Sequence, residues 1–111
     1  MGVTLYLNDG MNEDSEFKDN VFESSYTYNV SKMWYKIYPN DEGMIYIDGM
    51  TGAEAYKKLA HARKVLEANP YKFMAMNPPN GFGSYYGFLE FINKLIIQCI
   101  EYPEFIWESW R

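Results

Sequence analysis

The chain has 111 residues, and 48% of them are hydrophobic, which is enough for one domain with a buried core. The formal net charge is −5, and the acidity is concentrated in residues 1–23, which hold six acidic residues and one lysine. Such a chain lacks the basic surface of a non-specific nucleic-acid-binding protein. Its longest apolar run, residues 95–97, is far below the ~20 residues of a membrane span. We therefore expect neither a direct nucleic-acid partner nor a membrane.

The cysteine content and the N-terminal residues indicate a compartment. Cys99 is the single cysteine, so it has no partner for an internal disulfide. No basic-then-apolar leader opens the sequence. We therefore expect the protein in a reducing cytoplasm.

The first predicted element is a strand at residues 3–7. Val3, Leu5 and Leu7 alternate there with polar or aromatic residues, which is typical of a strand with one buried face. Residues 9–23 are polar and acidic with few apolar anchors, so we expect a mobile acidic loop.

Alternation resumes at Ser24 and predicts a second strand, with Tyr26, Tyr28 and Val30 on one face. Residues 32–38 fit either a continuation of this strand or a short helix, and the pattern leaves both open. The polar segment that starts at Pro39 ends the element in either case.

The second half of the chain predicts two helices. Residues 44–48 are expected to form a brief strand or an extended approach to the first. Thr51 and Glu54 have the spacing of a capping box, so this helix begins after Thr51 and runs to about Ala68, before Asn69-Pro70. At 100° per residue its core stripe and the exposed His61 lie on opposite faces. The stripe comprises Ala55, Leu59, Ala62 and Leu66.

The second helix is expected to begin at the N-cap Ser84 and to run to Tyr102, before Pro103. A broad apolar arc, which extends to Ile100 and Tyr102, predicts that this helix is central. Ile97 projects among charged residues, which leaves a contact between two copies open. Residues 104–110 alternate as a last strand. The predicted fold is α+β: a small, mostly antiparallel sheet packed on two helices, in a single domain over residues 1–111.

Residues that could carry out catalysis are few. The lone histidine is predicted to be exposed between two lysines, and no pair of His, Cys or carboxylates shows metal-ligand spacing. We expect no metal and no cofactor. An enzyme stays the minor alternative, as a small hydrolase that uses Asp48 or Glu54 as acid or base.

Residues 77–87 read N-P-P-N-G-F-G-S-Y-Y-G, which is too irregular for a helix interior. The prolines stiffen the approach, and Asn80-Gly81 is a turn dipeptide. Phe82 lies between two glycines, so it either fills the core or presents its ring to a ligand. A rigid cap on the core and a ligand-binding loop both remain open for this stretch.

Two motifs resemble a family of small uncharacterised proteins of bacteria and their phages. Residues 26–33, Y-T-Y-N-V-S-K-M, are similar to I-T-H-N-L-x-x-M, and residues 77–87 are similar to N-P-x-N-G-W-G-S-Y-E-G. This chain has Tyr28 in place of the His, Phe82 in place of the Trp and Tyr86 in place of the Glu. If that His and Glu are catalytic elsewhere, the resemblance implies an inactive member that binds, in the cytoplasm of a host cell if a phage encodes it.

The sequence thus predicts a non-enzymatic, phage-type protein that sequesters a small nucleotide-like signal or otherwise blocks a component of host defence. Rings would stack on the ligand, and amides at the helix start, those of Ser84, Tyr85 and Tyr86, would hold its phosphate. The expected ligand-binding residues are Asn29, Trp34, Asn77, Asn80, Phe82, Ser84, Tyr85 and Tyr86. The alternative is a protein–protein inhibitor whose acidic N-terminal arm docks on a basic site of a host protein.

Overall fold

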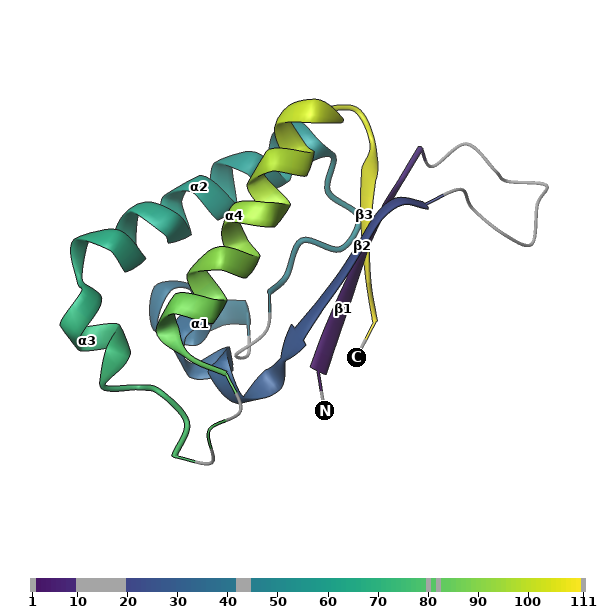
Figure 1. The fold of residues 1–111 in the computed structure, drawn as a ribbon. Coiled ribbons are helices and arrows are strands. Elements are labelled where there is room, and N and C mark those ends of the chain that lie inside the picture. Colours follow the sequence, from purple (N-terminus) through teal and green to yellow (C-terminus); the bar gives the residue numbers. More distant parts are fainter. Residues whose placement is uncertain (1, 10–19, 42–44, 80, 82, 111) are drawn as a thin grey trace.

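The computed structural model describes residues 2–9, 20–41, 45–79, 81 and 83–110. Three strands, β1 (Gly2–Asn8), β2 (Asn20–Thr27) and β3 (Ile106–Trp110), form one sheet in the order β2-β1-β3, with both pairings antiparallel. Figure 1 shows the helices gathered on one side of this sheet. The predicted α+β class is confirmed.

The sheet faces the helices with its apolar side chains. Val3, Leu5 and Leu7 of β1 and Trp107 of β3 are buried, as their alternation predicts. Phe22 of β2 meets the Trp107 ring edge to face, with centroids 6.0 Å apart. The central strand β1, which is paired on both edges, therefore supplies most of the buried apolar side chains that these strands contribute to the core.

The outer edge of β3 is covered by the chain that enters the long helix. The Gly49 amide donates to the Trp107 carbonyl at 2.8 Å, and the Trp107 amide donates to the Met50 carbonyl at 2.9 Å. The Asp48 carboxylate accepts from the amide of Ser109 at 2.7 Å. Residues 48–52 thus satisfy the main-chain groups of β3 that face away from β1.

The helical elements follow the first two strands. They are the 3₁₀ turn η1 (Tyr28–Val30), α1 (Ser31–Ile37), the 3₁₀ turn η2 (Pro39–Asp41), α2 (Gly52–Ala68), α3 (Pro70–Met74) and α4 (Tyr85–Glu101). In Figure 1, α2 and α4 lie side by side over the sheet, and they are packed against each other. Of the two alternatives left open for residues 32–38, the structure shows the short helix, which ends at Ile37.

The second strand differs from its prediction at both ends. It begins at Asn20, inside the segment expected to be a mobile loop, and it ends at Thr27, so Tyr28 and Val30 lie in η1. The reason is the partner strand: β1 runs from Gly2, opposite Thr27, to Asn8, opposite Asn20. Among the described residues, no further pair extends this ladder beyond either end. Residues 10–19, the rest of the expected loop, lie outside the described residues.

The ends of the two long helices agree with their local signals. Thr51 and Glu54 form the complete capping box at the start of α2, and Ser84 Oγ accepts the Gly87 amide at the start of α4. His61 and Ile97 are exposed as predicted. The prediction for Ile100 is wrong: the apolar arc placed this residue in the core, but it is 65% exposed.

Of the two alternatives left open for residues 44–48, the strand is not formed, and a short helix that was not predicted follows Pro70. Residues 45–48 form no strand, although Ile45 and Ile47 are buried on either side of the exposed Tyr46. Pro70 ends α2, as expected, but it also starts α3 at the first helical position, where a missing amide costs nothing. Phe73 of α3 is buried. Within the described parts of the chain, no helix has the length and apolar character to cross a membrane.

Candidate functional site

A cleft of about 470 Å³ opens between η1 and α1 on one side and the chain that leaves α3 on the other. Asn29 and Lys32 line the first side, and residues 75–79 line the second. Its volume falls within the range of small-molecule pockets. We refer to it as the Asn29–Asn77 cleft.

The second wall of the cleft is held by main-chain bonds and prolines. The Met76 amide donates to the Phe73 carbonyl at 3.0 Å, the Asn77 amide to Met74 at 3.1 Å and the Gly81 amide to Pro78 at 3.3 Å. Pro78 and Pro79 have fixed φ angles and lose little freedom when the wall forms. This wall is therefore set before any ligand arrives.

Asn77 connects the cleft to the start of α4. Its Oδ1 accepts the Tyr85 amide at 2.8 Å, and the Tyr26 hydroxyl oxygen accepts the Ser84 amide at 3.2 Å. These amides were expected to point outward toward a ligand. Two of the three are bonded to side chains of the protein instead, so the α4 N-terminus is largely satisfied internally.

The two tyrosines at the start of α4 differ in position. Tyr85 is 3% exposed and its hydroxyl donates to the Leu66 carbonyl at 2.7 Å, whereas Tyr86 is 66% exposed. Burial, then the nearby Glu67 and Tyr86, raise the pKa of Tyr85. Tyr85 therefore fixes α4 to α2, and Tyr86 leaves a ring on the surface.

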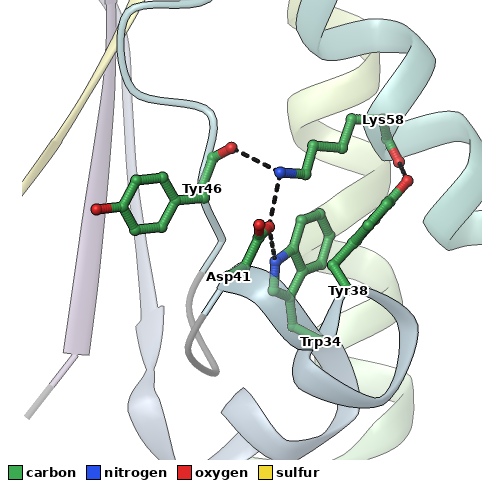
Figure 2. A network of polar contacts seen from close by, with 5 residues as sticks. All are labelled: Trp34, Tyr38, Asp41, Tyr46 and Lys58. Carbon is green, nitrogen blue, oxygen red and sulfur yellow. Dashed lines mark hydrogen bonds and ion pairs between the residues drawn. The ribbon is translucent and has the colours of Figure 1, made fainter.

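Trp34 lies in a separate polar network, which Figure 2 shows from close by. Its side chain is fully buried, and the indole N–H donates to Asp41 Oδ2 at 2.8 Å. Lys58 forms an ion pair with the same oxygen at 2.6 Å and also donates to the Tyr46 carbonyl at 3.0 Å. The network joins α1, η2 and α2.

Tyr38 completes this network. Its hydroxyl donates to the Lys58 carbonyl at 2.8 Å, and the Lys58 ammonium lies 4.9 Å from the Tyr38 ring centroid. Burial and then the Asp41 charge raise the pKa of Tyr38. Each polar group of Trp34 and Tyr38 is thus used inside the protein, which gives Trp34 a structural role.

The structure brings together only part of the predicted site. Asn29 and Asn77 line the cleft, and Ser84, Tyr85 and Tyr86 stand at the helix start that Asn77 caps. Trp34 does not line it. Asn80 and Phe82, which were also predicted to bind the ligand, lie outside the described residues.

The sequence-based prediction missed Lys32, and it also missed the apolar cleft residues Ala75, Met76, Pro78 and Pro79. Lys32 is exposed, and among the described residues that line the cleft it is the one with a charge. The signal was its spacing: in a helical segment, positions three apart such as 29 and 32 face the same side. That inference depended on residues 32–38 being helical, which the pattern had left open.

The two carboxylates considered for catalysis are engaged elsewhere. Asp48 is bonded to Ser109, and Glu54 caps α2, where the Thr51 amide and then the Thr51 hydroxyl lower the pKa of its carboxyl. Among the residues that the structure describes, no group of three or more His, Cys, Asp or Glu could hold a metal ion.

Comparisons with protein-family models, with curated proteins and with solved structures found no match to this chain.

Proposed function

We propose that this protein is a non-enzymatic binding protein that takes a small, anionic, nucleotide-like molecule in the Asn29–Asn77 cleft. The observation that carries the proposal is that Lys32 lines the same cleft as Asn29 and Asn77, a cleft with one rigid wall. An ammonium group provides the charge for phosphate or carboxylate. Side-chain amides provide both donors and acceptors, which suit the edge of a base.

The rest of the cleft lining supports binding rather than turnover. Met76, Pro78 and Pro79 offer apolar surface against which a flat group can lie. As far as the structure describes the lining, it includes no pair of nucleophile and base of the kind that covalent catalysis uses. The cleft lining and the resemblance to bacterial and phage proteins together support a specific role, the capture of a small signal that a host defence system needs.

A thermal-shift panel of mono- and dinucleotides tests the proposal. A ligand that binds only the folded chain stabilises it by RT ln(1 + [L]/Kd), or about 2.7 kcal/mol at 100 times Kd. Lys32→Ala removes the charged contact and is expected to weaken binding ~10- to 100-fold. Lys36→Ala is the matched control, because Lys36 is exposed in the same helix and does not line the cleft.

Three results would contradict the proposal. They are a panel in which no nucleotide raises the melting temperature, an equal effect of the two lysine substitutions, and conversion of the bound nucleotide during incubation as seen by mass spectrometry. The last result would favour the hydrolase.

A second candidate, a protein–protein inhibitor, is favoured by the charge distribution. All lysines and arginines of the described residues lie on helices, whereas the strands carry Glu23 and Glu108. Residues 10–19, between β1 and β2, add four acids and one lysine. These acidic residues would attract a basic site on a host protein. Deletion of residues 10–19 should abolish such docking and leave nucleotide binding in the cleft intact.

A further inference from the structure

The two edges of the sheet differ in how they are protected. The outer edge of β3 is covered by residues 48–52, as described above. Within the described residues, the outer edge of β2 has no strand beside it, and no main-chain group outside the sheet bonds to it. An uncovered edge presents a row of donors and acceptors to any extended chain.

Strand β2 also lacks the features that usually prevent pairing at an edge. It spans eight residues, Asn20–Thr27, without a proline or a lysine, and Glu23 is its one charged residue. The irregularity in its pairing with β1 falls at Leu7/Asn8, near the Asn20 end. The remainder, from Phe22 to Thr27, is in regular register, so it can pair on its free side.

We propose that two copies of this chain pair through their β2 strands around a twofold axis, which joins their sheets into one antiparallel sheet of six strands. Residues directly opposite each other in such a pair must point to the same face. The twofold axis, which is perpendicular to the sheet, therefore lies midway between the two copies of one β2 residue. An axis that set two neighbouring residues opposite each other would pair side chains on opposite faces.

The residues of β2 select one register. An axis at Glu23 or at Ser24 pairs seven residues of the strand, but the axis at Ser24 keeps five of them within the regular part Phe22–Thr27, and the axis at Glu23 keeps three. The axis at Glu23 sets two like charges directly opposite each other, which is unfavourable. The axis at Ser24 sets Glu23 opposite Ser25 of the second copy, and Phe22 opposite Tyr26 of the second copy.

This self-complementary register is the reason for assigning a second copy as the occupant. Phe22 and Tyr26 lie on the helix side of the sheet, where Tyr26 stacks on Phe91 of α4 with ring centroids 5.5 Å apart. Aromatic pairs across strands are among the more favourable ones. None of these residues lines the Asn29–Asn77 cleft, so the dimer is independent of the proposed function.

Single-cysteine crosslinking tests the register. With the axis at Ser24, the two Ser24 Cα atoms lie about 4.5 or 5.5 Å apart, within reach of a disulfide. The two Ser25 Cα atoms are diagonal neighbours at ~7–8 Å, beyond easy reach. Ser24→Cys is therefore expected to give a covalent dimer on mild oxidation, and Ser25→Cys is the matched control. Native Cys99 is 1% exposed and should not contribute.

Sedimentation equilibrium tests the dimer without crosslinking. The expected mass rises with concentration from 13.1 kDa toward twice that value. Ser25→Glu places a carboxylate opposite Glu23 of the second copy and should weaken the dimer roughly tenfold, whereas Ser25→Lys should preserve or tighten it. Ser25 is exposed, so both variants should fold. A monomer at every concentration, equal effects of Glu and Lys at residue 25, or equal crosslinking at residues 24 and 25 would overturn the proposal.

Discussion

Asp41 holds two donors with one carboxylate oxygen. Trp34 Nε1 and Lys58 Nζ both contact Oδ2, and the side chains of Lys58 and Asp41 are only 17% and 14% exposed. A donor that loses its partner in such a setting cannot be fully solvated. The carboxylate therefore stabilises the junction of α1, η2 and α2 through two bonds at once.

Replacement of Asp41 tests this junction. Asp41→Ala removes the acceptor of the Trp34 indole N–H and the charge partner of Lys58, whose ammonium keeps its bond to the Tyr46 carbonyl. It should lower the free energy of unfolding by about 2–3 kcal/mol, as measured by urea denaturation. Asn40→Ala at the exposed neighbouring residue is the control and should stay within about 0.5 kcal/mol. If Asp41→Ala also stays within that range, the network contributes little.

The segment before α4 is held by close packing at Gly83. Its φ is +92°, and an added Cβ would lie 2.5 Å from Thr27 Cγ2 and 2.9 Å from Val30 Cγ1. Both neighbours are short β-branched side chains, which cannot swing aside. Gly83 thus allows this segment to approach the end of β2 and η1.

A pair of glycine substitutions separates backbone strain from this close approach. Gly81 also has a positive φ, +78°, but nothing lies within 4 Å of an added Cβ. Gly81→Ala should cost about 1 kcal/mol from backbone strain alone, and Gly83→Ala should cost ~1–3 kcal/mol more from the clash. Equal losses in urea denaturation would show that the close approach at Gly83 is unimportant.

The sequence predicted those elements whose signals are local. The capping box of Thr51 and Glu54 and the N-cap Ser84 act within a few residues, so both helix starts are correct. The length of β2 depends on its pairing with β1, and the role of Trp34 depends on its contacts with Asp41 and Lys58. The periodicity of apolar residues in the sequence does not reveal such contacts between distant segments. In the candidate site, Asn29 and Asn77 were identified from the sequence. Lys32 was not, because its place beside Asn29 depends on the helical conformation of a segment that the pattern left open.

For the molecule as a whole, burial of weak acids determines the response to alkali. Burial raises the pKa of Cys99 from 9.0 to about 11, and a weak interaction with the Trp107 indole only partly opposes this. That indole N–H has no well-formed hydrogen bond among the described residues. Tyr38 and Tyr85 are shifted upward as well.

Stability should therefore fall as the pH rises from 9 toward 11. In this window the unfolded chain releases the Cys99 proton while the folded chain retains it, so stability is complete below pH 9 and is lost as the pH rises through the folded pKa of about 11. Cys99→Ala should be less stable at neutral pH but should show a shallower decline, measured as the free energy of unfolding at several pH values. An unchanged slope in this variant would contradict the assignment.

The pairing of β1 with β3 brings together opposite ends of the sequence, with Thr4 beside Trp110. Contacts of such separation close late and slow the folding of small domains. On the ribosome, the nascent chain can form α2 and much of α4 while β1 still lacks a neighbour on one side. The sheet can be completed only once the segment that carries Trp110 has left the exit tunnel.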